Sequence, residues 1–262
     1  MEEEIIETIR NLAVLMGKAE MIAIIYNPYK EGLEPKDMIS LKSLMNNNVY
    51  NSPLFLLSGH GGSFNAGVHF PHIIKQSVKT YKVYIPSVCA SALGFMLFLS
   101  DGLVISRKSK ITQLDPLVIQ EDGQVLRAVD YMNNLVKDEI RNKSKEAFNA
   151  TRDQLVKFCE ESKLFSFKTW ERGDYYFREY LEVIFMKKED HDRAVTKKEL
   201  DELEVKYELI DSQDIEKVSF DLIRLCRKHL EENDARVIFV SSKSFKIGTE
   251  EGLKKGCGIF VS

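Results

Sequence analysis

The sequence predicts an α/β fold built on a largely parallel sheet, and three observations support this prediction. Short apolar runs without polar alternation are typical of strands that are covered on both faces. Segments with helical periodicity separate these runs, and such alternation indicates right-handed βαβ crossovers. Charge is also uneven along the chain. Between residues 51 and 106 the only charged side chains are Lys75, Lys79, Lys82 and Asp101, which is typical of a buried core.

A predicted helix precedes each of the first four predicted strands. The predicted strands are Met21–Tyr26, Leu54–Ser58, Lys82–Pro86, Gly102–Ile105 and Pro116–Gln120. The predicted helices are Glu2–Met16, Pro35–Met45, Asn65–Val78 and Ala90–Leu99.

The pattern changes after Gly123 to long amphipathic helices, which we expect to form a lobe beside the sheet. These helices are Val125–Asn149, Arg152–Ser162 and Gly173–Met186, followed by a polar loop at Lys187–Arg193. Thr196 and Glu199 have the spacing of a capping box, which predicts the start of a short helix. A helix near Ile215–Glu232 and an apolar strand at Arg236–Ser241 close the chain.

The composition excludes several classes of protein. With 44% hydrophobic and 29% charged residues, the chain is neither disordered nor of low complexity. A net charge of −3 predicts no nucleic-acid partner. The acidic start at Glu2 lacks the basic region of an export signal, and the longest nearly apolar run, Val88–Leu99, is shorter than the roughly 18 residues of a membrane span. We therefore expect a cytoplasmic protein without a transmembrane segment.

Cysteine and histidine spacing predicts neither disulfides nor a metal site. The four cysteines are Cys89, Cys159, Cys226 and Cys257, and no two of them form a CxxC pair. This scatter fits a reducing compartment. His69 and His72 share His-x-x-His spacing, but no third ligand lies nearby in the sequence.

The segment Ser58-Gly59-His60-Gly61-Gly62-Ser63 lies between a predicted strand and a predicted helix. Glycines at such a junction let backbone N–H groups approach a ligand closely. The segment lacks the Lys-Ser/Thr of a Walker loop, and Phe64 stands at the last glycine position of a GxGxxG pattern. It therefore suits an oxyanion better than a nucleotide, and a tight turn without further function is the alternative.

The segment from Pro86 to Gly94 forms a second strand-to-helix junction and contains Ser91. A serine at the start of a helix has its alkoxide stabilised by the helix dipole. The segment is not a GxSxG nucleophile elbow, because Cys89 and Leu93 stand where that motif has glycines. A tightly packed helix start is the alternative interpretation.

Two further segments carry candidate catalytic side chains. Asp115 precedes Pro116, a position that is most often a turn. His191 lies in the charged run Lys187–Arg193, which by itself indicates a solvated loop.

The order and spacing of these segments resemble the Clp protease and crotonase superfamily, and more closely the serine dehydrogenase proteinase family, which is related to the signal peptide peptidases. In that family a strand ends in a His-Thr-Pro-Gly-Gly loop, and Ser58-Gly59-His60-Gly61-Gly62 is similar to it. A Pro-x-x-Ala-Met-Ser-Ala-Gly-Thr segment follows in the family, and Pro86 with Ser91-Ala92 matches it.

Three later segments extend the resemblance, which covers roughly residues 9–209. The family's Ala-Asp pair is similar to Ser100-Asp101, and its Leu-Gly-Pro-Ile-Asp-Pro segment is similar to the stretch that ends in Asp115-Pro116. Its Thr-His-Asp-Tyr-Pro-Ile-Thr segment resembles residues 190–196, which contain His191.

The resemblance implies an α/β fold of the Clp/crotonase type, a spiral of βαβ units with a helical lobe and a C-terminal extension. It implies a serine peptidase domain over residues 1–209, and it leaves residues 210–262 as a C-terminal α/β extension of unknown role. It also implies a homo-oligomer.

The resemblance further implies a mechanism. Ser91 corresponds to the nucleophile, His191 to the general base and Asp115 to the carboxylate that orients this base. Backbone N–H groups of Gly61 and Gly62, with that of Ala92 as a contributor, correspond to the donors that stabilise the oxyanion. The implied activity is ATP-independent hydrolysis of a peptide or unfolded protein through an acyl-enzyme, without a cofactor.

Departures from the family pattern keep other functions open. Leu93 replaces a glycine, His60 replaces a proline, and Arg193-Ala194 replaces Tyr-Pro. One alternative is a catalytically degenerate peptide-binding or scaffold protein. Another is a crotonase-like enzyme acting on an acyl thioester, although residues 51–99 contain none of the carboxylates it would need.

A lysine base, as the resemblance to the signal peptide peptidases implies, is the alternative to His191. Lys143 lies 52 residues after Ser91, about the spacing found in the shorter members of that family, and Lys145 is close by. Both lie in a charged helical stretch, so a solvated helix face is the competing interpretation.

Overall fold

The computed structural model describes residues 1–30, 32–114, 116–119, 125–128, 130, 138–164, 174–186, 193–242 and 245–249. Within these ranges seven strands form one sheet in the order β11-β10-β1-β2-β3-β5-β9. Five strands are parallel, namely β1 (Met21–Tyr26), β2 (Leu54–Ser58), β3 (Lys82–Ile85), β5 (Gly102–Ser106) and β9 (Tyr207–Ile210). The other two, β10 (Ala235–Ser241) and β11 (Phe245–Thr249), are antiparallel to their neighbours. The predicted α/β fold with a largely parallel sheet is confirmed.

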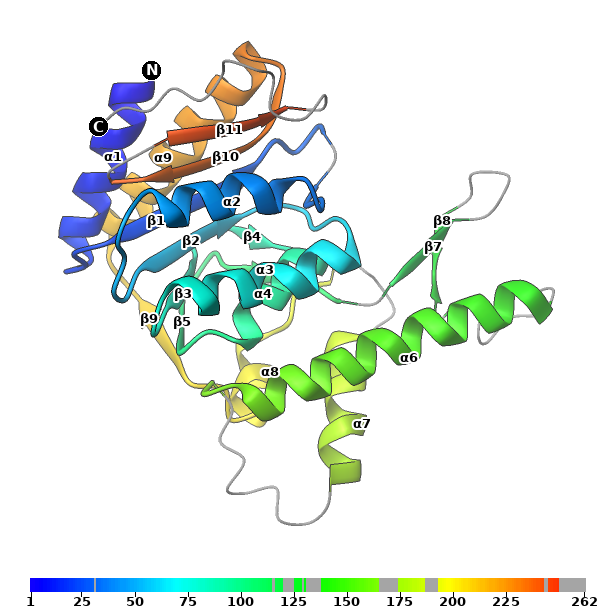
Figure 1. Cartoon of the computed structure of the whole chain (residues 1–262). Helices are drawn as coiled ribbons and strands as arrows, with labels where there is room; N and C mark the ends of the chain where they lie inside the picture. Colours follow the sequence, from blue (N-terminus) through cyan, green and yellow to red (C-terminus); the bar gives the residue numbers. More distant parts are fainter. Residues whose placement is uncertain are drawn as a thin grey trace.

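Helices cover both faces of this sheet, which explains why its strands lack polar alternation (Figure 1). Along β1, Ile22 and Ile24 pack into the core beneath α2 (Asp37–Asn46) and α3 (Phe64–Ser77). Met21, Ala23 and Ile25 of the same strand point to the opposite face, into the core beneath α1 (Glu2–Leu15) and α9 (Gln213–Glu232). One strand therefore supplies two cores by its period of two.

The C-terminal segment joins this sheet directly. Strand β10 pairs with β1 in antiparallel register, with Ile24 opposite Phe239, and β11 lies on its outer side. Helix α9 packs against α1 beneath the same strands. The described part of residues 210–262 therefore completes the core that the N-terminal strand begins.

The predicted helix Ala90–Leu99 is only partly correct. The structure has a short strand β4 (Val88–Cys89), a 3₁₀ turn η1 (Ser91–Gly94) and a short helix α4 (Phe95–Phe98). Ala90 is extended, with φ −108° and ψ 151°, because its N–H donates to the carbonyl of Gly59. Strand β4 pairs in parallel with β6 (Lys110–Ile111), which the sequence pattern did not indicate.

The helical lobe also differs from its prediction at two places. The strand predicted at Pro116–Gln120 forms as β7 (Leu117–Ile119), but it pairs with β8 (Val125–Arg127) in a hairpin outside the main sheet. The start predicted for the helix Val125–Asn149 is therefore wrong, although its later residues lie in α6. The break predicted near residue 150 is also wrong, because α6 runs without interruption over Asp138–Glu161. The Thr151 hydroxyl donates to the carbonyl of Ala147 at 2.9 Å, which satisfies this side chain inside the helix.

The remaining helices follow their patterns. Helix α7 spans Asp174–Phe185, close to its predicted range, and α8 spans Lys197–Glu202. The predicted capping box is confirmed, since Thr196 N–H donates to Glu199 Oε2 at 2.8 Å and Glu199 N–H donates to Thr196 Oγ1 at 3.3 Å. Strand β9 was missed, because Glu208 and Leu209 in its centre are exposed and the run is not apolar.

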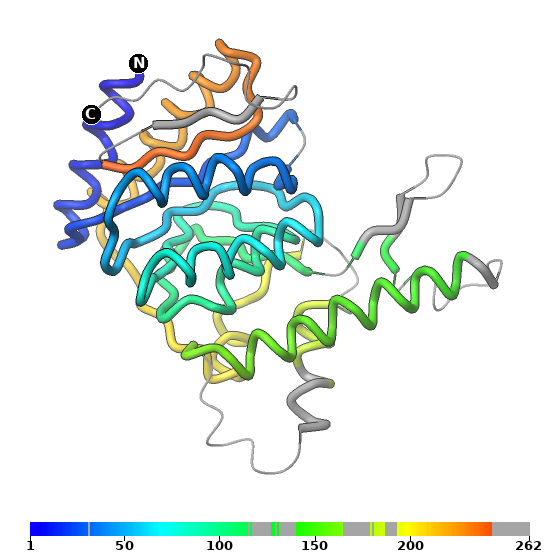
Figure 2. The backbone as a smooth tube through the Cα atoms, in the orientation of Figure 1, coloured from blue at the N-terminus to red at the C-terminus, as the bar shows by residue number. Residues whose placement is uncertain are grey.

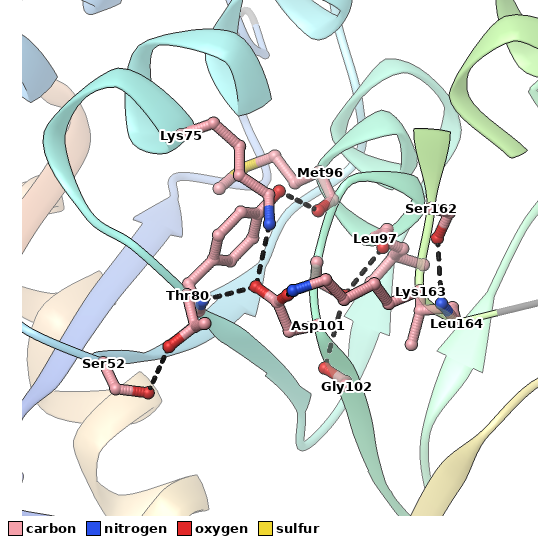
Figure 3. Close-up of polar contacts among 12 residues, drawn as sticks. Ser52, Lys75, Thr80, Met96, Leu97, Asp101, Gly102, Ser162, Lys163 and Leu164 are labelled. Carbon is pink, nitrogen blue, oxygen red and sulfur yellow. Dashed lines mark hydrogen bonds and ion pairs between the residues drawn. The ribbon is translucent and has the colours of Figure 1, made fainter. Parts of the chain in front are cut away.

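Asp101, in the turn before β5, ties the end of α6 to the sheet (Figure 3). Its Oδ2 accepts bonds from Lys75 Nζ at 2.8 Å and from the N–H of Tyr81 at 3.0 Å. Its Oδ1 lies 2.8 Å from Nζ of Lys163, just after α6. Burial opposes the charged form, but bonds from Lys163 and Lys75 outweigh it and lower the pKa of Asp101. Helix α6 is thereby anchored at one end, and it continues past the sheet (Figure 2).

None of the helices in the described ranges is both long enough and apolar enough to cross a membrane.

Candidate active site

The two glycine- and serine-bearing junctions of the sequence lie side by side at the ends of β2 and β3. The N–H of Gly59 donates to the carbonyl of Val88 at 2.9 Å, and the N–H of Ala90 donates to the carbonyl of Gly59 at 3.0 Å. These bonds pair the chain beyond β2 with β4 in the parallel sense. The segment Gly59–Gly62, called the glycine loop below, is thereby held next to Ser91.

Ser91 has an unusual backbone conformation. Its φ is +47°, in the left-handed region that non-glycine residues rarely occupy. It is the first residue of η1, and its side chain is half-buried. Such strain persists only where surrounding structure enforces it, and it gathers at functional sites. Glu204 and Asp234 also have positive φ, at +52° and +49°, but of the three only Ser91 lies next to the glycine loop and carries a hydroxyl.

Gly61 lies directly against the Ser91 side chain. It has φ +95°, and a Cβ placed on it would lie 2.6 Å from Cβ of Ser91 and 3.2 Å from Oγ of Ser91. A side chain at this position would therefore collide with the serine, which explains the glycine. Gly62 has φ +143°, and a Cβ placed on it would lie 2.2 Å from the backbone N of Leu33. A side chain at this position would therefore collide with the backbone of Leu33.

The amide groups beside Ser91 are available to bind an oxyanion. Within the described ranges, the N–H groups of Gly61 and Gly62 donate none of the hydrogen bonds found. The carbonyl of Gly61 accepts from the N–H of Leu33 at 2.5 Å, so the N–H of Gly62 in the same trans peptide points the opposite way. Ala92 is the second residue of η1, where an N–H has no partner inside the helix.

Thr112 is a site residue that the sequence analysis did not single out. Its Oγ1 accepts the N–H of Ser91 at 3.2 Å, and its own N–H donates to the carbonyl of Cys89 at 3.2 Å. It follows β6 directly and is 4% exposed. The sequence did not indicate Thr112 as a site residue, because the short strand β6 before it has no recognisable pattern.

The two proposed partners of the serine, Asp115 and His191, lie outside the described residues. Two backbone bonds involve residues near them. Leu114 donates its N–H to the carbonyl of Phe185, the last residue of α7, at 2.7 Å. Val195 donates its N–H to the carbonyl of Ile111 in β6 at 2.6 Å. The residue after Ile111 is Thr112, which contacts Ser91.

The alternative bases lie on the exposed face of a helix. Lys143 and Lys145 belong to α6, and both side chains are exposed. A lysine that acts as a base needs a desolvated setting. In the described part of the chain, Ser91 makes no hydrogen bond to either lysine.

Leu93, which replaces a family glycine, points into the core. Its side chain is fully buried, and its Cδ2 would lie 3.1 Å from a Cβ placed on Gly59. The leucine therefore packs beneath the glycine loop and not over the half-buried Ser91. Cys89 is also fully buried, and burial raises the pKa of its thiol, so Cys89 does not compete with Ser91 as a nucleophile.

The histidines of the described ranges form no metal cluster, since no group of three or more His, Cys, Asp or Glu side chains there could hold a metal ion. His60 is exposed in the glycine loop. His72 packs edge-on against Phe158, with ring centroids 5.2 Å apart, and burial lowers its pKa. This packing gives His72 a structural role.

A cleft of about 490 Å³ is lined by residues 105–111 and 194–197, together with Leu200 and Leu209. None of the candidate site residues described above lines it. Ile111 lines the cleft and pairs with Cys89 of β4, so the strand that borders the cleft also borders the nucleophile segment.

Comparisons with known proteins gave only distant likenesses. No family model matches the chain, and no curated protein matches it. Among solved structures, it is similar to ClpP1 from Listeria monocytogenes, with 12% identity, a TM-score of 0.44, and coverage of 81% of this chain and 97% of that one. It is also similar to a mutant of the 1510-N membrane-bound stomatin-specific protease, with 12% identity, a TM-score of 0.44, and coverage of 68% and 73%. The chain has the mixed α/β architecture with a mostly parallel sheet that the sequence predicts. These likenesses say nothing about the reaction.

Proposed function

We propose that the protein is a serine peptidase that cleaves peptide bonds through an acyl-enzyme on Ser91. One observation carries the proposal, namely that Ser91 has a strained backbone, with φ +47°, directly opposite the glycine loop. A nucleophile and amide donors side by side are the two parts that acyl transfer needs first.

The proposed reaction follows from these parts. Ser91 Oγ attacks the substrate carbonyl while its proton passes to the base, which we assign to His191, with Asp115 orienting the imidazole. The N–H groups of Gly61 and Gly62 stabilise the resulting oxyanion, with Ala92 as a third donor. Collapse of the tetrahedral intermediate breaks the peptide bond, and the leaving amine takes the proton from the base. Water then hydrolyses the ester, and no cofactor enters either step.

The proposal includes an extended peptide or unfolded protein as substrate, membership in the serine dehydrogenase proteinase family, and assembly into a homo-oligomer. The motif order described above supports the family. The exposed position of Lys143 and Lys145 on α6 supports a histidine base over a lysine base.

Labelling with a fluorophosphonate probe tests the nucleophile. The probe phosphonylates an activated serine with loss of fluoride, and it needs the oxyanion donors to do so. We expect the purified wild-type protein to carry one adduct, mapped to Ser91 by mass spectrometry, and Ser91→Ala to carry none. If the folded wild-type protein is not labelled but still binds an unfolded protein, the peptide-binding alternative replaces the peptidase.

Two glycine variants test the contact between the glycine loop and Ser91, with a matched control. Gly61 and Gly17 both have positive φ, at +95° and +61°, so alanine is strained at both positions. Only at Gly61 does the new Cβ meet Ser91, because nothing lies within 4 Å of a Cβ on Gly17. We expect Gly61→Ala to reduce the labelling rate about 100-fold or more, because the new Cβ displaces the Ser91 side chain from its place against the glycine loop. Gly17→Ala is expected to label like the wild type, and equal rates for all three proteins contradict the assignment.

A further inference from the structure

The largest fully buried side chain in the described part of the molecule is an arginine. Arg236, near the start of β10, is 0% exposed. A buried guanidinium is costly unless it is paired and hydrogen-bonded, so its partners indicate what it does.

Arg236 is paired with Asp37, the first residue of α2, which is 1% exposed. The two side chains meet in a bidentate arrangement, with Nη1 donating to Asp37 Oδ2 at 3.0 Å and Nη2 donating to Oδ1. Asp37 Oδ2 also accepts the N–H of Glu34 at 2.9 Å and the hydroxyl of Tyr26 at 3.1 Å. The pair therefore fixes the start of α2 and the chain before it.

The same guanidinium also holds the backbone that touches the glycine loop. Nη1 of Arg236 donates to the carbonyl of Gly32. A Cβ placed on Gly32 would lie only 1.9 Å from the carbonyl oxygen of Gly61, so the two backbones are in direct contact. The next residue, Leu33, then clamps the loop through both of its backbone groups.

Leu33 donates its N–H to the carbonyl of Gly61 at 2.5 Å, and its own carbonyl accepts the N–H of Ser63 at 2.6 Å. These bonds set the orientation of the Gly61–Gly62 peptide, which carries one of the proposed oxyanion donors. The carbonyl of Gly61 cannot turn without losing its bond from Leu33.

The ion pair also supports the other end of the glycine loop, through Tyr26. Tyr26, which donates its hydroxyl to Asp37, packs its ring against Gly59, where a Cβ would lie 2.9 Å from Tyr26 Cδ2. Both ends of the glycine loop are thus backed by groups that bond to the Arg236–Asp37 pair.

We propose that Arg236 is a positioning residue for the oxyanion loop, supplied by the C-terminal segment of the chain. This inference rests on the proposed function, in which Gly61 and Gly62 supply the oxyanion donors. A well-packed pair of apolar side chains is often at least as stable as a buried ion pair. The orientation of the Gly32 carbonyl, however, needs a donor, and no apolar side chain provides one. Residues 210–262, to which the sequence assigns no role, thereby become part of the active-site support.

The test compares Arg236→Lys and Asp37→Asn with a control on the opposite core. Lysine keeps the charge but cannot bond Asp37 and Gly32 through a planar fork, and asparagine keeps the volume without the charge. The control is Tyr84→Phe, which removes a buried bond of 3.1 Å between Tyr84 Oη and Ser219 Oγ, and so also loosens the C-terminal segment from the sheet. All measurements are made at a temperature where circular dichroism shows each variant to be folded.

Two readouts separate positioning from general stability. We expect Arg236→Lys and Asp37→Asn to lower the fluorophosphonate labelling rate at least tenfold and to raise deuterium uptake in residues 59–63, whereas Tyr84→Phe changes neither. With an unfolded protein as substrate, kcat should fall while KM stays within about twofold, because an oxyanion donor acts in the transition state.

Failure of this inference and failure of the proposed function give different results. If the wild type labels and both pair variants label at the wild-type rate, Arg236 does not position the loop. If the wild type does not label at all, the proposed function fails, and deuterium uptake in residues 59–63 still decides the positioning role. Unchanged uptake in a folded Asp37→Asn variant overturns that role even when Arg236→Lys does not fold.

Discussion

Two ionic clusters in the described part of the molecule differ in burial and in what they bind. Arg236 and Asp37 are 0% and 1% exposed, and their pair bonds to backbone next to the glycine loop. The side chains of Asp101, Lys75 and Lys163 are 11%, 30% and 68% exposed, and they join α3, β3 and the end of α6. The first cluster supports the proposed site, and the second anchors the helical lobe.

The difference shows that burial determines how much the loss of one charge costs in stability. Breaking a buried pair leaves one charge without compensation in a low dielectric, whereas charges on partly exposed side chains are partly screened by water. Loss of one partner alone is therefore most costly in the buried cluster, which lies where a small backbone shift would move the oxyanion donors. The partly exposed cluster lies where the lobe only needs to be attached.

The largest effect is expected from breaking the buried pair on one side. We predict that Arg236→Met lowers the free energy of unfolding by about 3–5 kcal/mol, because Asp37 is left as an unpaired buried charge. Urea denaturation followed by circular dichroism measures this. The double variant Arg236→Met/Asp37→Leu should recover most of the loss, since neither charge remains. A double variant as unstable as the single one would show that packing, not the charge, explains the loss.

A smaller effect is expected at the partly exposed cluster. We predict that Asp101→Asn lowers the free energy of unfolding by about 1–2 kcal/mol near neutral pH, because bonds from two partly solvated lysines are weakened. The pKa of Asp101 is lowered in the folded protein, so its stabilisation is present above the ordinary range of an aspartate and is lost as the pH falls through the folded-state pKa. Denaturation curves at a series of pH values should therefore show wild type and variant converging in acid. A constant difference down to pH 2 would contradict this origin.

The smallest effect is expected at a fully solvated pair. Lys197 Nζ lies 2.8 Å from Asp201 Oδ2 on α8, and bonds to Asp201 and Tyr207 raise the pKa of this lysine. Both side chains are half or more exposed, at 59% and 50%. We predict that Lys197→Met leaves the urea midpoint unchanged within error, since exposed pairs contribute little. If Lys197→Met shifted the urea midpoint as much as Asp101→Asn does, the stability effects of these ion pairs would not follow their burial.

Local signals predicted much of the scaffold. The runs at Met21–Tyr26 and Leu54–Ser58 form buried parallel strands, and the Thr196–Glu199 capping box forms as predicted. In each case the deciding interactions lie within a few residues or follow from apolar content. The hairpin β7–β8 and strand β9 were not predictable in this way, because their pairing partners decide their structure. The division of the chain at residues 209 and 210 stays a prediction.

The candidate site shows the same limit. The family resemblance implied roles for Ser91, Gly61, Gly62 and Ala92, and the structure brings the first two into contact. The contact of Thr112 with Ser91 depends on the parallel pairing of β4 and β6. Strands of two residues leave no recognisable pattern in a sequence, so this pairing could not be predicted. Asp115 and His191 stay predictions.

By itself, the sequence determined which segments are buried, where the strand-to-helix junctions fall, and that glycines and a serine occupy them. Only the tertiary structure decided the left-handed backbone of Ser91 and the pairing of Arg236 with Asp37, 199 residues apart. The physical reason is that burial and capping follow from neighbouring residues, whereas strain and buried charge persist only where distant parts of the chain pack around them.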